Sequence, residues 1–182
     1  ETLARAVSEP LRLFFKRKNV VLVIVFMLTY KCAHYMALSA NIFFLHKMGF
    51  ATTEIATVSK PMTLLGVIFG GVVVSQITPR LGLYRSLWVF GLLELLSNLV
   101  YVVLYFVGKS VTMMAFSFFV VNFFASMGTV VFTTFMLGLC DSGYTVAQYA
   151  FFSALMSFPL VLAGFFSAWY IPKYGFVFYY VL

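Results

Sequence analysis

The sequence predicts an all-α membrane protein, a polytopic bundle of helices joined by short loops. Two observations on composition and one on pattern support this fold class. Hydrophobic residues make up 63% of the chain and charged residues only 9%, whereas soluble domains contain about 25% charged residues. The apolar residues form runs of more than about 20, long enough for a helix to cross the roughly 30 Å hydrocarbon layer. The connections between these runs are too short to form a soluble domain.

The first predicted span covers residues 19–45 and is interrupted by two ionisable residues, Lys31 and His34. At about 1.5 Å per residue, Lys31 lies about 18 Å beyond Asn19, near the middle of the bilayer. A charge at that depth costs several kcal/mol unless it faces protein or water, so it is a candidate functional residue. His34 follows three residues later and shares the same helix face.

Further spans follow at regular intervals. In the second span, Gly66 and Gly70 are four residues apart, a spacing that lets a neighbouring helix approach closely. The sequence ends in an apolar stretch, which we interpret as a truncated sixth span, so we expect the chain to be part of a larger protein or assembly. The expected spans after the first are about 54–77, 86–107, 111–139, 145–171 and the truncated 176–182.

The basic residues indicate the orientation of the bundle. Residues 1–18, expected to be a basic cytoplasmic linker or an amphipathic segment, and the 78–85 loop together carry seven Lys/Arg. The opposite side carries only Lys47, Lys109 and Lys173. Because cytoplasmic loops are rich in Lys and Arg, the N-terminus is predicted to be cytoplasmic. We therefore interpret the net charge of +7 as a topology signal and expect no nucleic-acid partner.

Glu94 is the only acidic residue well inside a span, about 12 Å from the start of residues 86–107. A carboxyl group there can hold or release a proton as its surroundings change, which is the basic requirement for proton coupling. The alternative is a structural ion pair with Lys31. His34 could titrate near neutral pH and join the proton coupling, or it could be a hydrogen-bonded packing residue.

Five residues are candidates for substrate binding. Lys31 could bind a substrate carboxylate, or it could only pair with Glu94. Lys60 could line the substrate pathway, or its side chain could extend to the interface as an anchor. The three remaining candidates have amide side chains, which could line a substrate cavity or form hydrogen bonds between helices; they are Asn98, Asn122 and Gln148.

Enzyme motifs are missing from the sequence, which has no HExxH, no GxSxG, no P-loop lysine motif and no GxGxxG. Cys32 and Cys140 lie in or beside predicted spans and form no disulfide or zinc framework. We therefore expect no catalytic residues, no metal site and no cofactor. Any ligand would bind between the helices.

Short stretches distributed over about residues 19–170 carry a resemblance to a known family. The most specific is TVAQYA at 145–150, and others are GGVVVSQITPRLGLYR at 70–85, MGT at 127–129 and SNL at 97–99. In this combination and order the chain resembles the AmpG-type muropeptide permeases of the major facilitator superfamily. The chain resembles the C-terminal half of the proteins in that family.

The resemblance implies a fold of two six-helix bundles with the substrate bound between them near the midplane. This chain would supply five complete helices and part of the sixth from the C-terminal bundle, and an N-terminal six-helix half would be its partner. The implied function is proton-coupled import of anhydromuropeptides, or a related anionic small molecule, across the bacterial inner membrane. Membrane lipid would surround the bundle.

The chain also departs from the family pattern. His34 and Val121 stand where the family places acids, Leu160 stands where an arginine is expected, and Glu94 replaces a neutral amide. One interpretation is that charge pairing has been rearranged, with Glu94 now facing Lys31. Others are a relative with another substrate, such as acetyl-CoA, or a non-transporting remnant or interaction protein from a split gene.

Overall fold

The computed structural model describes residues 9, 12–16 and 18–181, and within them the ordered structure is helical with no strands. The predicted all-α fold is therefore confirmed. Most of the segment expected to be a cytoplasmic linker, residues 1–18, lies outside the described residues. The helices are α2 (Val20–Tyr30), α3 (Cys32–Lys47), α4 (Thr52–Leu81), α5 (Leu83–Ser97), α6 (Leu99–Val107), α7 (Val111–Leu139) and α8 (Thr145–Val181).

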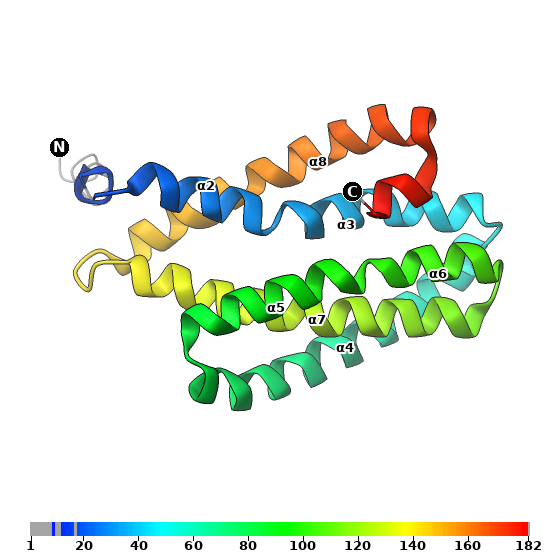
Figure 1. The fold of residues 1–182 in the computed structure, drawn as a ribbon, viewed down its shortest axis with the longest axis horizontal. Helices are drawn as coiled ribbons and strands as arrows, with labels where there is room; N and C mark the ends of the chain where they lie inside the picture. Colours follow the sequence, from blue (N-terminus) through cyan, green and yellow to red (C-terminus); the bar gives the residue numbers. More distant parts are fainter. Residues whose placement is uncertain (1–8, 10–11, 17, 182) are drawn as a thin grey trace.

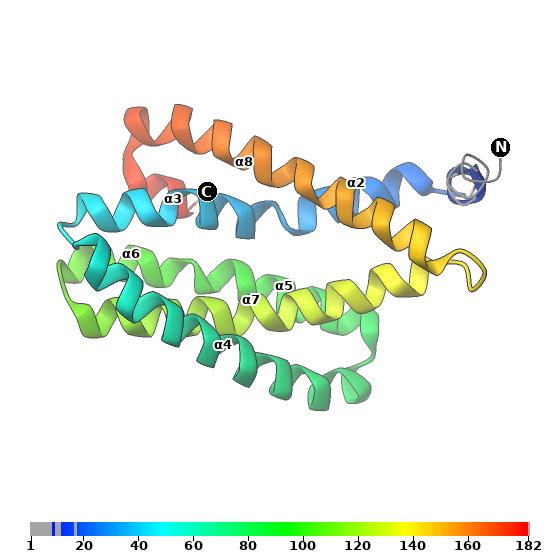
Figure 2. The same cartoon turned by 180° about the vertical axis from the view of Figure 1, so that it is seen from behind.

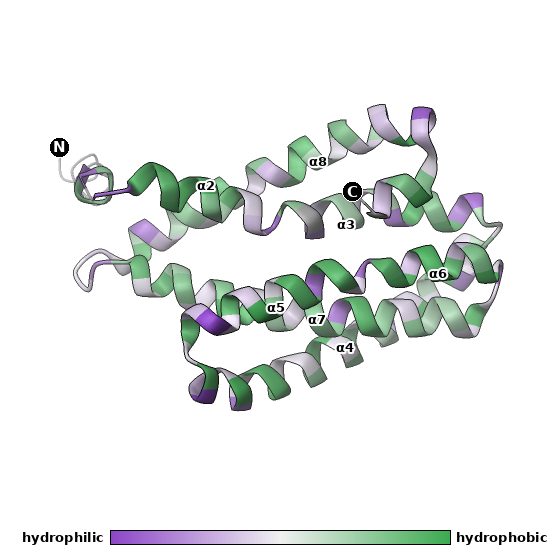
Figure 3. Cartoon of the chain, viewed as in Figure 1, coloured by the Kyte–Doolittle hydropathy of each residue, from purple (hydrophilic) through white to green (hydrophobic). Residues whose placement is uncertain are grey.

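These helices form five stretches that are long and apolar enough to cross a membrane, with α2–α3 and α5–α6 each counting as one. Many of their large apolar side chains are exposed on the outside of the bundle, among them Phe43, Trp88, Phe106 and Phe165. Figure 3 shows that apolar residues dominate every helix along its length. In a polytopic membrane protein this outer surface contacts lipid.

The stretches run up and down, so the connections collect at two ends (Figure 1). The start of α2, the α4–α5 connection and the α7–α8 connection lie at one end, and the α3–α4 and α6–α7 connections lie at the other (Figure 1). The start of α2 and the α4–α5 connection therefore lie at the same end of the bundle.

Two of the stretches predicted as continuous helices are interrupted near their middle. Lys31, with φ −94° and ψ 0°, separates α2 from α3. Between α5 and α6 the backbone tightens, because Asn98 N–H donates to Leu95 O and Tyr101 N–H donates to Asn98 O, each three residues back. Such i to i−3 bonds mark a short 3₁₀ turn, which commonly occurs at functional hinges. One interruption is at Lys31 and the other lies four residues after Glu94, and these are the two charged residues described below.

Glycines allow two of the other changes of direction. The connection expected over residues 78–85 is a single residue, Gly82, with helix on both sides and a φ of 79°. Gly175, with a φ of 81°, breaks α8 into two helical pieces. Side chains disfavour a φ in this range, so glycine allows turns this tight.

The close approach of α4 and α7 depends on the glycine pair identified in the sequence. A Cβ added to Gly66 would lie 2.7 Å from Phe119 O, and one added to Gly70 would overlap Phe123 O and Ser126 Oγ. Figure 2 shows α4 crossing α7 from behind the bundle. The glycines thus let the backbones of the two helices touch, as their spacing predicts.

The interior contains two apolar clusters, one toward the α3–α4 connection and the other toward the start of α2. One is built around residues such as Phe44 and Leu104, and the other around Met27 and Phe90. Between them, at the level of the helix interruptions, lies a layer of buried polar residues. The buried polar residues at or near the interruptions include Lys31, Glu94, Ser97 and Asn98.

Candidate functional site: a buried lysine–glutamate pair

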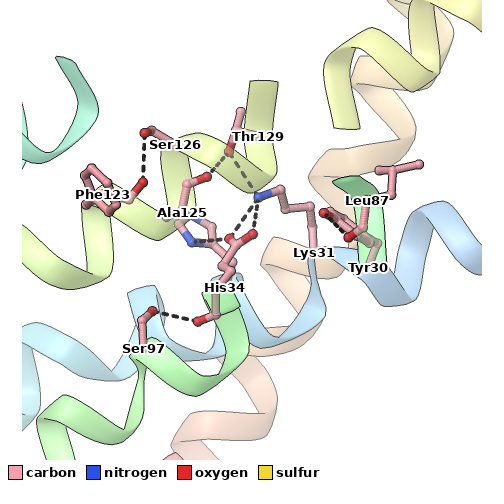
Figure 4. A network of polar contacts seen from close by, with 10 residues as sticks. Tyr30, Lys31, His34, Leu87, Ser97, Phe123, Ala125, Ser126 and Thr129 are labelled. Atoms are coloured by element: carbon pink, nitrogen blue, oxygen red, sulfur yellow. Dashed lines mark hydrogen bonds and ion pairs between the residues drawn. The ribbon is translucent and has the colours of Figure 1, made fainter. Parts of the chain in front are cut away.

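Lys31 and Glu94 meet in the middle of the bundle, although 63 residues separate them in the sequence. Lys31 comes from the junction of α2 and α3, and Glu94 from the last turn of α5, and each residue is only 4% exposed. The Nζ atom of Lys31 lies 2.8 Å from Oε1 and 3.0 Å from Oε2 of Glu94 (Figure 4). Both charges therefore face protein rather than lipid, in the rearranged pairing that the sequence left as one alternative.

Helix α7 forms the third side of the pair. Lys31 Nζ donates to Thr129 Oγ1 at 3.0 Å, and the Thr129 hydroxyl donates in turn to Ala125 O at 2.7 Å. The carboxylate of Glu94 lies directly against Gly128, where an added Cβ would overlap Oε2. The glycine opens space for the carboxylate and the adjacent threonine supplies an oxygen for the ammonium group, so α7 holds both charges.

His34 also reaches the carboxylate, one helical turn beyond Lys31. Its Nδ1 lies 3.2 Å from Glu94 Oε1, and 27% of its side chain is exposed. Glu94 is almost fully buried, whereas His34 is not, so the imidazole lies between the carboxylate and more open space. An imidazole in such a position can accept a proton and pass it to a neighbouring group.

Hollows lie on two sides of the ion pair. One, of about 290 Å³, is lined by Glu94 and His34 and opens between α2 and α5. The other, also about 290 Å³, is lined by Lys31, His34, Thr129 and Ser153, and lies between α3, α7 and α8. The two charges thus border different hollows, and His34 borders both.

The surroundings make the pairing of these charges energetically decisive. Removing a charged side chain from water costs several kcal/mol, and only a close partner with good hydrogen bonds offsets that cost. An apolar side chain would pack inside a membrane without this cost. A charged residue that is kept there therefore usually has a functional role. The arrangement therefore points to a role for the charges beyond packing.

Some contacts of the site were not identified from the sequence. Tyr30 stacks on Phe132 at 4.9 Å between ring centroids, donates its hydroxyl to Leu87 O at 3.1 Å, and lies with its ring 5.8 Å from Lys31 Nζ. Thr129 was noted only within a motif. Two glycines in the sequence could have indicated these contacts. Gly128 lies against the Glu94 carboxylate and Gly91 against the Tyr30 ring, and in both places a glycine allows a side chain to approach the helix closely.

The two asparagines predicted as binding residues lie near the pair without touching it. Asn98 is buried at the α5–α6 junction and lines a hollow of about 460 Å³ with Cys32 and Tyr180. Asn122 donates to Phe118 O at 2.7 Å and lines a hollow of about 150 Å³ that His34 also lines.

The other two predicted binding residues are not at the pair. Gln148 is buried at the start of α8, where its Nε2 donates to Asp141 Oδ2 at 2.9 Å and its Oε1 accepts from Asp141 N at 2.7 Å. It thereby fastens the α7–α8 connection. Lys60 is exposed on α4 and lines a different hollow, between α3 and α4.

The described residues contain no group of three or more His, Cys, Asp or Glu side chains placed to bind a metal ion. The two cysteines, Cys32 and Cys140, are not joined in a disulfide.

Comparison with known proteins finds that the chain is similar to bacterial permeases and transporters. It is 33% identical over 176 residues, 96% of its length, to the anhydromuropeptide permease of Escherichia coli K12. It is 29% identical to an uncharacterized protein of Haemophilus influenzae over 92% of its length, and 24% identical to the putative transporter AmpG 3 of Rickettsia typhi over 81%. No family model and no solved structure matches the chain.

These alignments confirm the resemblance to the AmpG-type permeases. The aligned part spans 36%, 42% and 35% of the three relatives, so the chain corresponds to less than half of each. Those with a functional name are called permease or transporter, which supports the expectation that this chain is not an enzyme. Together with five apolar helices, the similarity supports a multi-pass protein of the bacterial inner membrane.

Proposed function

We propose that this chain is the C-terminal half of a secondary transporter that couples the uptake of an anionic solute, an anhydromuropeptide, to protons. The observation that carries the proposal is the buried pair of Lys31 and Glu94, with His34 and Thr129 as neighbours. The substrate class comes from the name of the E. coli relative, an anhydromuropeptide permease. The charge count adds a cytoplasmic N-terminus.

Anion binding follows from the charge balance of the pair. While Glu94 is ionised, Lys31 is neutralised at 2.8 Å and does not need another anion. When Glu94 takes up a proton, the ammonium group of Lys31 is left without a counter-charge in a buried place, which is strongly unfavourable. A carboxylate of the solute, entering the hollow between α3, α7 and α8 that Lys31 lines, restores neutrality.

Proton and solute are therefore expected to occupy the site together. Either one alone leaves a net charge buried between two apolar clusters, and both together leave none. His34, 3.2 Å from Glu94 and partly exposed, provides the path by which a proton reaches the carboxylate. Asn122 lines the hollow next to His34 and is proposed to bind polar groups of the solute; for Asn98 and Gln148 a binding role stays a prediction.

The proposal requires a second bundle. Transporters of the major facilitator type move a solute by rocking two six-helix halves around a site at their interface. We propose that the N-terminal half covers the hollows beside Lys31 and alternately opens them to the two sides of the membrane.

The test uses the full-length transporter, with both halves, in proteoliposomes. We expect labelled anhydromuropeptide to accumulate when the outside is made more acidic than the inside. Glu94→Gln mimics the protonated state permanently, so it should abolish proton-driven accumulation while exchange of labelled for unlabelled solute continues. Glu54→Gln, which changes an exposed carboxylate, is the matched control and should accumulate solute normally.

Two results would contradict the proposal. If the unsubstituted protein does not take up anhydromuropeptide, this solute is not its substrate. Undiminished accumulation by the Glu94→Gln variant would remove this carboxylate from the coupling mechanism.

A further inference from the structure

A large hollow lies between α3 and α4, apart from the Lys31–Glu94 pair. Its volume is about 640 Å³, and its lining extends from His46 and Thr52, beside the α3–α4 connection, inward to Val67 and Phe118. Apolar side chains form much of the wall. Six polar residues also line it, and they are Asn41, His46, Thr52, Ser59, Lys60 and Thr63.

Lys60 gives this hollow a positive charge. It is exposed on α4, about 12 Å along the helix from Thr52, and it has no ion-pair partner in the part of the chain that the structure describes. An ammonium group at that depth, with no carboxylate beside it, attracts an anion from outside the chain.

Asn41 gives the hollow a hydrogen-bonding group that is only half used. Its Nδ2 donates to the hydroxyl of Tyr101 at 2.7 Å, whereas its Oδ1 is buried without a partner. Whichever way the amide is turned, Tyr101 satisfies one end, because a hydroxyl both donates and accepts. An unpaired buried polar atom is costly, so the amide would gain a partner by turning toward a ligand in the hollow that Asn41 lines.

Shared lining residues connect the hollow with the surroundings of the ion pair. A smaller hollow of about 150 Å³ shares Asn41 and Thr63 with it and is also lined by His34. His34 in turn contacts Glu94 and borders the hollow lined by Lys31. Polar groups therefore follow one another from the α3–α4 end of the bundle to its centre.

We propose that the hollow between α3 and α4 is an outer subsite for the same solute, which it holds before the solute reaches Lys31. Lys60 binds a carboxylate of the solute, and Asn41 hydrogen-bonds a neighbouring amide or hydroxyl group. The apolar wall accommodates the less polar parts of the molecule. This inference rests on the proposed function, and the expected orientation, with the α3–α4 connection outside the cytoplasm, suits the entry of an imported solute.

The experiment measures labelled anhydromuropeptide uptake by the full-length transporter in proteoliposomes. Removing a charged hydrogen bond should raise KM about tenfold or more in Lys60→Met, and removing a neutral one about threefold to tenfold in Asn41→Leu, with kcat nearly unchanged. Lys47→Met is the control, because Lys47 is an exposed cation at the same end whose ammonium group lies over the Phe176 ring.

A second measurement applies even if a variant transports poorly. In a background without Cys32 and Cys140, Ser59→Cys places a thiol on the wall of the hollow. Anhydromuropeptide should slow its reaction with a membrane-impermeant maleimide, and Lys60→Met should remove this protection.

The outcomes distinguish the alternatives. Uptake by the unsubstituted protein, with unchanged KM in both variants and no protection of the thiol, overturns the subsite alone. Protection by phosphatidylglycerol in the vesicles, and none by the solute, assigns the hollow to an anionic lipid headgroup and also overturns it. Absence of uptake by the unsubstituted protein contradicts the proposed function and, with it, this subsite.

Discussion

The part of the chain that the structure describes contains two lysine–glutamate pairs in opposite environments. Lys31 and Glu94 are 2.8 Å apart with side chains 5% and 6% exposed, whereas Lys109 and Glu54 are 3.2 Å apart with side chains 47% and 38% exposed. The residue types are identical and the distances nearly so. What differs is the access of water, and this difference determines what each pair can do.

The exposed pair is replaceable because each member has other partners. Glu54 also accepts a hydrogen bond from Ala51 N–H at 2.8 Å, and Lys109 lies 5.5 Å from the Phe50 ring centroid. The buried charges also have polar neighbours, Thr129 beside Lys31 and His34 beside Glu94, but very little access to water. A proton added to the exposed pair changes little, whereas a proton added to Glu94 leaves Lys31 without a counter-charge. Only the buried pair can therefore convert proton binding into a demand for an anion.

The largest expected effect comes from removing one member of the buried pair. Lys31→Met leaves the carboxylate of Glu94 buried with only His34 nearby, so the free energy of unfolding should fall by about 3–5 kcal/mol. Denaturation of the purified protein in mixed micelles with increasing sodium dodecyl sulfate measures this change.

The double variant Lys31→Met, Glu94→Leu shows whether the loss comes from the unpaired charge. Its stability should return to within about 1–2 kcal/mol of the original, because apolar residues can replace a buried ion pair with little loss. Its transport should stay absent. A double variant as unstable as Lys31→Met would mean that packing, rather than charge, explains the effect.

An intermediate effect is expected at Gly128, which lets α7 touch the carboxylate. Gly128→Ala places a Cβ where Glu94 Oε2 lies, so the carboxylate has to move and the protein should lose about 1–3 kcal/mol. Gly138→Ala on the same helix is the control, because its Cβ would meet nothing within 4 Å.

The same micelle titration compares the two glycine variants. Gly138→Ala should be neutral or slightly stabilising, because alanine favours the helix. Equal stability of the two variants would show that the carboxylate does not depend on its contact with α7.

The amino-acid sequence predicted the buried pair better than it predicted the geometry around it. Lys31 and Glu94 stand out because a charge in an apolar run has to find a partner, and few partners are available. Gly66 and Gly70 were informative for a similar reason, since a glycine pair in a membrane helix marks a contact. Both predictions start from residues that are unfavourable in a membrane helix unless they make a particular contact, and such residues can be recognised in the sequence alone.

The interruptions at Lys31 and Asn98 could not be predicted in this way. Neither residue is a helix breaker, and the breaks depend on which neighbours pack against α3 and α6. Gln148 shows the same limit: an amide in an apolar run predicts a hydrogen bond, but its partner Asp141 is fixed by the path of the α7–α8 connection. Tertiary packing, rather than local pattern, decides such partners.

The smallest effect is expected at the exposed pair. Lys109→Met should change the free energy of unfolding by less than about 1 kcal/mol, because water and salt screen exposed charges and long side chains lose entropy when they pair. Glu54→Gln also alters the cap of α4, so a double-variant cycle is needed to isolate the interaction between the two charges. The coupling energy should be a few tenths of a kcal/mol and should disappear at high salt. A coupling energy as large as that of Lys31 and Glu94 would show that burial is not what distinguishes the two pairs, and the argument for proton coupling at Glu94 would lose its basis.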